Sequence, residues 1–309
     1  MNTVREAIEE YFTLRRQLGF KVVNQQRYLL DFASFMEAQE VPFITTEAAL
    51  AWALIPGSAQ PSFWSQRLAA VRCFARHRCA ADPRTQIPPA DLLHHRPRRA
   101  RPYLYSEKDI KRLLKATEGL RPAGGFRGFT YATLLGLLVV TGLRISEALA
   151  LLVEDVDLTH GLLTIRKTKF GKTRLVPLHP SARCAMERYA RQRHTLVGSR
   201  IKHFFVSSQG QPLIAGNVWK TFRLLRRRVG LKASDRWDTP TLHHFRHRFA
   251  TQSLLRWYRA DDDAERLLPL LSTFLGHVST SSTYWYLSCH PELMGHAMRR
   301  LEQRWEKTP

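Results

Sequence analysis

The chain has 309 residues, of which 44% are hydrophobic, so it has enough apolar side chains for folded cores and is not a disordered tail. Its 48 Lys and Arg residues outnumber 26 Asp and Glu residues, which gives a formal net charge of +22. Self-repulsion makes such a charge costly unless the protein binds a polyanion, most often nucleic acid. Arginine predominates among the cations, and its planar guanidinium fits a phosphate group better than a lysine ammonium does.

The sequence contains no signal for a membrane or for secretion. The longest apolar run, at residues 134–140, is far shorter than the about 20 residues that cross a bilayer, and it indicates a buried helix. The N-terminus carries Glu6, Glu9 and Glu10 and does not resemble a signal peptide. The four cysteines lack the spacing of a disulfide framework, which favours a reduced protein. We therefore expect a cytoplasmic, nucleoid-associated protein with no membrane partner.

Residues 1–93 have a helical pattern, and we expect them to form a small four-helix domain. Apolar residues recur at helical spacing, and Thr45 and Thr46 followed by Glu47 mark the start of a helix. The last predicted helix, residues 62–78, carries several arginines, which face either a phosphate backbone or solvent. The candidates for DNA contact on it are Arg67, Arg72 and Arg76.

Residues 94–102 combine prolines with clustered positive charge, which is typical of a linker. We expect this basic linker to bridge two domains along a duplex, with a nuclear localisation signal as the alternative. Its candidates for DNA contact are Arg98, Arg99 and Arg101. Residues 101–309 hold 35 of the cations and 17 of the carboxylates, so most of the nucleic-acid surface should lie there.

The second predicted domain, residues 103–309, is helical with a small sheet. Ser106 caps a helix to about residue 117, an apolar helix covers 129–140, and a Thr-Gly turn leads into a helix at 144–152. Short alternating runs at 162–166 and 174–178 predict two strands of a hairpin. Further helices are expected at 181–193, 217–229 and 241–258, as a pair around 267–275, through residue 286, and at 291–305. The fold class is mainly α with a small β-sheet.

Four patches carry residues suited to phosphoryl transfer. They are Thr-Gly-Leu-Arg-Ile-Ser-Glu at 141–147, the lysine-bearing turn at 167–174, His-His-Phe-Arg-His at 243–247, and Leu-Gly-His at 275–277 followed nine residues later by Tyr286. Each patch alone has an ordinary explanation; an isolated tyrosine, for example, is most often a core or interface residue. Together they supply a nucleophile, cationic donors for non-bridging oxygens and an acid for the leaving oxygen.

In this order, Arg, Lys, His-x-x-Arg, His and Tyr, the patches resemble the tyrosine recombinases, the phage integrase family of site-specific recombinases. The resemblance covers the chain from about residue 103 to its end. It implies an α+β catalytic domain, and residues 1–93 resemble the family's helical core-binding domain, which clamps DNA.

Carried over by position, the resemblance assigns the catalytic residues. Arg144 is the first arginine, within Thr-Gly-x-Arg-x-x-Glu, and Glu147 supports it from the same helix. His243 and Arg246 fit His-x-x-Arg, and His277 fits Leu-Gly-His. Tyr286 falls at the nucleophile position.

Two of these assignments leave alternatives open. The family's register, counted back from the strand at 174–177, selects Lys169, although Lys167 and Lys172 also lie in the turn, which lacks the common Gly-Lys-Gly form. Lys172 and Arg174 are further candidates for DNA contact. Tyr284 is the alternative nucleophile; two residues from Tyr286, it points to a different helix face.

The family's mechanism, transferred to these residues, makes Tyr286 attack a scissile phosphate and form a 3′-phosphotyrosine with release of a 5′-hydroxyl. Two arginines, Arg144 and Arg246, hold the non-bridging oxygens together with His277. Lys169 is then the general acid for the 5′-oxygen. His243 assists proton movement at Tyr286. The ester conserves the bond energy, so the resemblance implies no cofactor and no metal.

Two sequence features could suggest a metal, and both have simpler explanations. Cys73, His77 and Cys79 lack a fourth ligand for zinc. The run of aspartates at 261–263 is better explained as a loop or a helix start.

The partners implied are double-stranded recombination sites and a homo-tetramer on DNA, with accessory or sister recombinases also possible. The C-terminal helix, 291–306, is expected to dock on a neighbouring protomer; docking on its own domain is the alternative. The segment around Tyr286 resembles recombinases of mobile elements more than chromosome-dimer resolvases. A type IB topoisomerase-like relaxation of DNA, and DNA binding without turnover, are the alternative functions.

Overall fold

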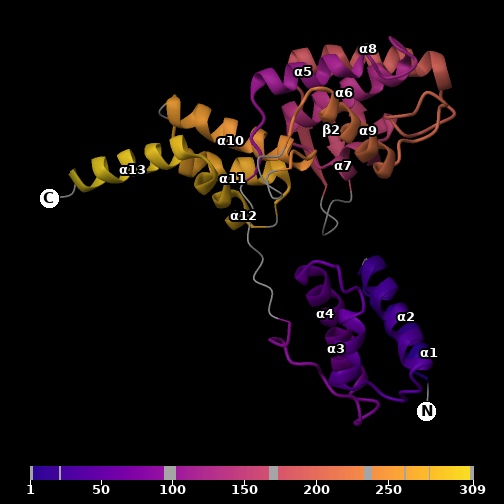
Figure 1. The fold of residues 1–309 in the computed structure, drawn as a ribbon. Helices are drawn as coiled ribbons and strands as arrows, with labels where there is room; N and C mark the ends of the chain where they lie inside the picture. Colours follow the sequence, from indigo (N-terminus) through magenta and orange to yellow (C-terminus); the bar gives the residue numbers. More distant parts are fainter. Residues whose placement is uncertain are drawn as a thin grey trace. The chain divides into compact units, whose positions relative to one another are not determined.

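The computed structural model describes residues 3–20, 22–93, 102–166, 173–232, 239–260, 262–277 and 279–306. The chain divides into two compact units, Met1–Arg99 and Ala100–Pro309, and Figure 1 shows both as mainly helical. The predicted linker at 94–102 lies, except for Pro102, outside the described residues, as do Arg98, Arg99 and Arg101. None of the described helices is long and apolar enough to cross a membrane.

The first unit is a bundle of four helices, as expected: α1 Val4–Gln17, α2 Val23–Ala38, α3 Thr46–Leu54 and α4 Pro61–Arg78. Local capping fixes two of the helix starts. The hydroxyl of Thr3 accepts from the backbone of Glu6 while the Glu6 carboxylate accepts from Thr3, and Thr45 caps α3 through Ala48. The largest side chains fully buried in its core include Phe12, Phe32, Trp52 and Phe74.

In the second unit, a first group of elements surrounds one large core. Ser106 and Asp109 form a capping box at the start of α5 Glu107–Thr117, which packs on α6 Phe126–Thr141. The remaining elements of this group are α7 Ile145–Ala150, η1 Val153–Asp155, β1 Val156–Asp157, β2 Leu162–Ile165, β3 Arg174–Pro177, α8 Pro180–Val197 and α9 Ala215–Arg228.

The three strands form one antiparallel sheet in the order β1-β2-β3. The predicted hairpin pairs Leu162 with Pro177 and Ile165 with Arg174, so β3 begins with an arginine directly after the lysine-bearing turn. The strand β1, only two residues long, was not predicted because its alternation is too short to detect.

A second group of helices, at the C-terminal end of the same unit, surrounds its own apolar cluster. Figure 1 shows α10 running beside α11 and the last helix, α13, in orange to yellow. These elements are α10 His243–Arg259, α11 Ala264–Leu275, α12 Ser281–Tyr284, η2 Trp285–Cys289 and α13 Pro291–Glu306. Helix α10 also packs on α6, which joins the two groups.

Two helical predictions in this region were wrong. The pair of helices expected around 267–275 is one helix, α11, with Pro269 inside it. The lost backbone hydrogen bond is offset because Leu268, Leu271 and Leu275 are buried. The predicted helix through residue 286 is instead one short helical turn continued by the 3-10 helix η2.

Candidate active site

Arg144 precedes α7 at a sharp turn that follows α6. Gly142 adopts φ 61°, and an added Cβ would lie 2.8 Å from a ring carbon of Phe249, so only glycine fits there. The turn places Arg144 at the N-cap of α7. Its Nη1 donates to Oε1 of Glu147 at 2.7 Å, so the two residues proposed to act together are in contact.

Arg246 is the most deeply buried cation of the site, at 2% exposure. Its Nη1 donates to the carbonyl of Gly142 at 3.0 Å and its Nη2 to the carbonyl of Leu275 at 2.6 Å. Burial, reinforced by the charge of Arg144, lowers the pKa of Arg246 to about 10, although a hydrogen bond with Tyr286 opposes the shift. The guanidinium therefore stays charged at neutral pH and lies beside the tyrosine.

Three arginines from three different elements bind three consecutive carbonyls at the end of α11. Arg174 of β3 donates through Nε to Phe274 at 2.8 Å, Arg246 of α10 binds Leu275, and Nη2 of Arg144 donates to Gly276 at 3.3 Å. Carbonyls at a helix C-terminus lack partners within the helix and carry partial negative charge, so cations are favoured there. The residue directly after these carbonyls is His277, and this arrangement fixes all three arginines around it.

Tyr286 lies in η2 and is 3% exposed. Its ring centroid is 6.0 Å from that of His277 and 5.4 Å from that of His247. Tyr284, the alternative nucleophile, is 53% exposed. The structure thus places Tyr286 in contact with the arginine and histidine cluster and Tyr284 at the surface.

Neutral histidines complete the cluster. Burial and the charges of Arg246, Arg144 and Arg174 lower the pKa of His277 to about 4. Burial and the charges of His243, His244 and Arg246 lower the pKa of His247 to about 3.

His243 lies at the start of α10, and part of its surface is exposed. The centroid of its ring is 4.7 Å from that of the His247 ring. Loss of surrounding water and the charge of Arg246 lower its pKa to about 4. All three imidazoles are therefore neutral near pH 7 and can exchange protons.

Lys169 and Lys172 lie outside the described residues, so their predicted roles remain predictions. In the structure, β2 ends at Ile165 and β3 begins at Arg174. Because Arg174 binds the end of α11, the start of β3 is held beside the site.

Two arginines predicted to contact DNA have other partners. Arg67 is buried at 6% exposure, with its guanidinium 3.8 Å from the ring centroid of Trp52 and an ion pair to Asp31 at 3.2 Å. The prediction for Arg67 was therefore wrong, because helical spacing did not reveal that it faces the core. Arg174 has a side chain only 9% exposed, which pairs with Glu147.

Arg72 and Arg76, the two further candidates on α4, differ in how exposed their side chains are. Arg72 is half-buried and donates to the carbonyls of Pro88 at 2.7 Å and Pro89 at 2.6 Å, so it anchors the segment after α4. Arg76 is exposed and remains a candidate for DNA contact.

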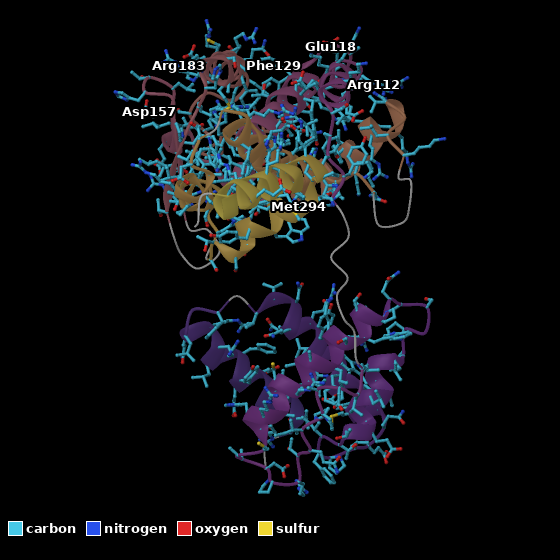
Figure 2. All side chains as sticks on the ribbon, turned by 90° about the vertical axis from the view of Figure 1, so that its left-hand side faces the viewer. Arg112, Glu118, Phe129, Asp157, Arg183 and Met294 are labelled. Carbon is cyan, nitrogen blue, oxygen red and sulfur yellow. The ribbon has the colours of Figure 1, made fainter. Side chains whose placement is uncertain are left out.

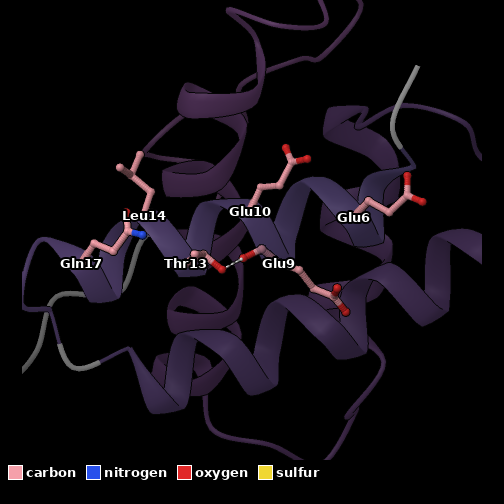
Figure 3. Close-up of a pocket in the computed structure, with 6 residues that line it drawn as sticks. All are labelled: Glu6, Glu9, Glu10, Thr13, Leu14 and Gln17. Atoms are coloured by element: carbon pink, nitrogen blue, oxygen red, sulfur yellow. Dashed lines mark hydrogen bonds between the residues drawn. The ribbon is translucent and has the colours of Figure 1, made fainter.

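Charge is segregated within the first unit. Figure 3 shows Glu6, Glu9 and Glu10 along one face of α1, where they line a shallow pocket with Thr13 and other residues of α1. These carboxylates are exposed, so this face repels phosphate and cannot be the DNA surface of the unit.

Among the described residues, no group of three or more His, Cys, Asp or Glu side chains is arranged to hold a metal ion. Asp263 instead accepts from the backbone of Arg266 at 3.2 Å, directly before α11. The predicted helix-start role of the aspartate run is confirmed for Asp263.

The comparisons with known proteins identify the class. Residues 104–292 match the phage integrase family. The protein y4rB of Sinorhizobium fredii, which its name calls an integrase/recombinase, is 52% identical over 311 residues, 99% of each chain. A second protein of that organism, y4rE, with the same description, is 35% identical over 297 residues, 96% of this chain and 94% of its own.

Solved structures share the fold. The integrase of transposon Tn1549 in complex with transposon right end DNA has a TM-score of 0.67 at 17% identity, over 97% of this chain and 100% of that one. A lambda integrase tetramer bound to a Holliday junction has a TM-score of 0.63 at 19% identity, over 92% and 77%. The fold and the family match define a tyrosine-type site-specific recombinase. The chain belongs to the phage integrase family and is an enzyme of DNA recombination.

Proposed function

We propose that the chain breaks and rejoins DNA through Tyr286 at sites that belong to a mobile element. One observation carries the proposal: Arg144 and Arg246 bind the carbonyls directly before His277, and Tyr286 contacts both Arg246 and His277. A nucleophile, two fixed cations and a neutral imidazole thus converge, which is the set that phosphoryl transfer requires.

The proposed reaction is the family's mechanism, assigned to these residues. The phenol oxygen of Tyr286 attacks the scissile phosphorus, and the bond from phosphorus to the 5′-oxygen breaks. Arg144, Arg246 and His277 donate to the non-bridging oxygens as their charge grows. The phenol proton leaves towards a neutral imidazole, with His243 as the acceptor, and a general acid protonates the 5′-oxygen. A 5′-hydroxyl later attacks the phosphotyrosine and restores both groups.

We assign the general acid to Lys169 on the family's register alone. Its test uses DNA with sulfur in place of the 5′-bridging oxygen, since a thiolate leaves without a proton. Lys169→Ala should cleave ordinary DNA slowly and the sulfur-containing DNA at the rate of the unaltered chain. Lys167→Ala and Lys172→Ala are the matched controls. If the sulfur-containing DNA restored the rate of one of these variants and not that of Lys169→Ala, that lysine would be the general acid.

The test of DNA cleavage by the full chain begins by selecting the sequence that it cleaves. The full chain is incubated with nicked duplexes of randomised sequence, in which cleavage beside the nick releases a short strand and traps the covalent complex. Sequencing of the trapped DNA gives the site, and mass spectrometry of the digested adduct gives the residue. Failure of any duplex to form an adduct would favour DNA binding without turnover.

The matched pair Tyr286→Phe and Tyr284→Phe decides the nucleophile. The first change should abolish the adduct and leave DNA binding nearly intact, because only the hydroxyl is lost. The second should leave the adduct, because Tyr284 is exposed at the surface. The reverse result would show that the register is wrong.

Recombination and topoisomerase-like relaxation differ in the number of duplexes joined. We propose a tetramer on two duplexes, with the exposed Met294 and Met298 of α13 in the contact between protomers; Figure 2 shows Met294 at the surface. Helix α13 also packs on its own unit through the buried Leu293. Formation of Holliday junctions between two selected sites supports recombination, whereas relaxation of plasmids without junctions would support the alternative.

The place of action follows from the substrate. We propose that the chain acts in the cytoplasm on nucleoid or mobile-element DNA. The proposal of a mobile element rests on the segment around Tyr286, which resembles recombinases of mobile elements more than chromosome-dimer resolvases.

A further inference from the structure

Thr283 hydrogen-bonds to His277 and so joins this histidine to the segment bearing the nucleophile. Its Oγ1 lies 2.7 Å from Nδ1 of His277. Thr283 is completely buried in α12, three residues before Tyr286. Its backbone N–H donates to the carbonyl of Thr280 at 2.7 Å, so the turn holds the hydroxyl in place.

The direction of this hydrogen bond decides what His277 offers to a phosphate. A neutral imidazole has one donor nitrogen and one acceptor nitrogen. If the Thr283 hydroxyl donates to Nδ1, the proton is on Nε2, which can then donate to a phosphate oxygen. If Nδ1 donates to the hydroxyl, Nε2 presents a lone pair and repels that oxygen.

The charges around His277 favour the neutral ring. Arg144, Arg174 and Arg246 face it from three elements, and His243 faces it from α10. A charged imidazolium would donate from both nitrogens and need no orienting partner. A neutral one needs a partner to select its tautomer.

We propose that Thr283 is a positioning residue, which donates to Nδ1 of His277 and so fixes the Nε2–H tautomer beside Tyr286. The proposal rests on the proposed function for the role of His277 in the reaction. The tautomer itself can be measured without DNA. Because Thr283 and Tyr286 share one short segment, the same bond also sets the position of His277 relative to the nucleophile.

The first experiment measures the tautomer of His277 by NMR in the full chain labelled with 15N-histidine, with His277→Gln to assign the signals. The expected result is an Nε2–H ring in the unaltered chain. Thr283→Val, which keeps the shape of the side chain and removes the hydroxyl, should give a mixture of tautomers. An Nδ1–H ring in the unaltered chain overturns the proposal.

The second experiment measures the rate of adduct formation on the nicked duplex selected by covalent trapping. Thr283→Val should slow the reaction roughly 10- to 100-fold, the loss typical when the orienting partner of a metal-binding histidine is removed. DNA affinity should stay within about twofold, because phosphate contacts elsewhere supply most of it. Thr283→Ser, which keeps the hydroxyl, should recover the rate.

A matched control and the tautomer separate this role from a structural one. Ser282→Ala removes an exposed hydroxyl from the same turn and should react at the full rate. A Thr283→Val chain that reacts as fast as the unaltered chain, or a Thr283→Ser chain as slow as Thr283→Val, overturns the proposal. If the unaltered chain forms no adduct, the proposed function fails, while the tautomer measurement still decides the direction of the bond.

Discussion

Glu147 and Arg174 face each other through two hydrogen bonds, from Nη1 to Oε1 at 3.2 Å and from Nη2 to Oε2 at 2.8 Å. Both side chains are nearly buried, and Glu147 also binds Arg144. Burial raises the pKa of Glu147, but the hydrogen bonds from Arg174 and Arg144 outweigh it and hold that pKa below its usual value. One carboxylate therefore orients two of the arginines that surround His277.

Glu147→Gln should damage both stability and cleavage. The change keeps the shape but leaves two arginines without their counter-charge, and removal of one partner from a buried ion pair costs about 3 kcal/mol. A small displacement of Arg144 should also slow adduct formation roughly 100-fold. Urea unfolding and the trapping assay measure the two effects.

Asp155→Asn is the matched control for Glu147→Gln. Asp155 is also a buried carboxylate near the sheet, but it pairs with the exposed Arg166, whereas Glu147 pairs with Arg144 and Arg174. This change should lower stability and leave the rate per folded molecule intact. Equal loss of rate in both variants would mean that Glu147 acts only through stability.

Gly276→Ala should disrupt the same cluster from the opposite side. Gly276 has φ +67°, and an added Cβ would lie 2.6 Å from Nη1 of Arg174. We expect this guanidinium to leave Phe274 and Glu147, with roughly 100-fold slower adduct formation. Gly124→Ala is the control. Gly124 also has φ +67°, but an added Cβ there would have no atom within 4 Å, so this variant introduces the backbone strain without a steric clash.

These arginine contacts show what sequence alone could and could not predict. Helix starts at Ser106 and Thr45 were correct because capping depends on neighbouring residues. The family's residue order placed Arg144 and Arg246 in one site, and the structure brings them to adjacent carbonyls. The roles of the catalytic residues remain predictions.

Contacts between distant residues could not be read from the sequence. The partner of Arg174, Glu147, is 27 residues away, and the pattern of β3 gave no sign that this arginine is buried. The contact of Thr283 with His277 was missed for the same reason, because only the folded chain brings the two together. A threonine three residues before the expected nucleophile was the only available signal.

Substitutions of Arg67 and Arg76, both on α4, should distinguish an arginine that stabilises the fold from one that binds DNA. Arg67→Met should lower stability by about 2 kcal/mol, because the charge-assisted bond from Arg67 to the carbonyl of Trp52 is lost. Its DNA affinity should keep the salt dependence of the unaltered chain. Arg76→Met should leave stability unchanged and reduce the slope of log affinity against log salt by about 0.9, the value for one phosphate contact.

Binding titrations at several salt concentrations, together with urea unfolding, check this pair. Arg67 is enclosed by Trp52 and Asp31, whereas Arg76 is exposed. A change of slope in Arg67→Met would show that the side chain leaves the core to bind DNA. An unchanged slope in Arg76→Met would remove this arginine from the DNA surface.

The histidine cluster should make the free chain less stable as the pH falls. The pKa of His247 is lowered to about 3 and that of His277 to about 4, both below the value of about 6.5 in an unfolded chain. Below pH 6.5 the unfolded chain therefore binds protons that the folded chain does not, and folding stability is lost progressively towards pH 4. Each such histidine contributes at most about 1.4 kcal/mol per pH unit.

Urea unfolding between pH 7.5 and 5 measures this loss, and His247→Gln isolates one contribution. Glutamine does not titrate, so the slope of stability against pH should become shallower, with the largest difference below pH 6.5. Gln192→Ala, which removes a side chain that does not titrate from an exposed position of α8, should leave the slope unchanged. Stability that is flat down to pH 5 in the unaltered chain would mean that the cluster accepts protons while folded, and that its histidines are not held neutral between the arginines.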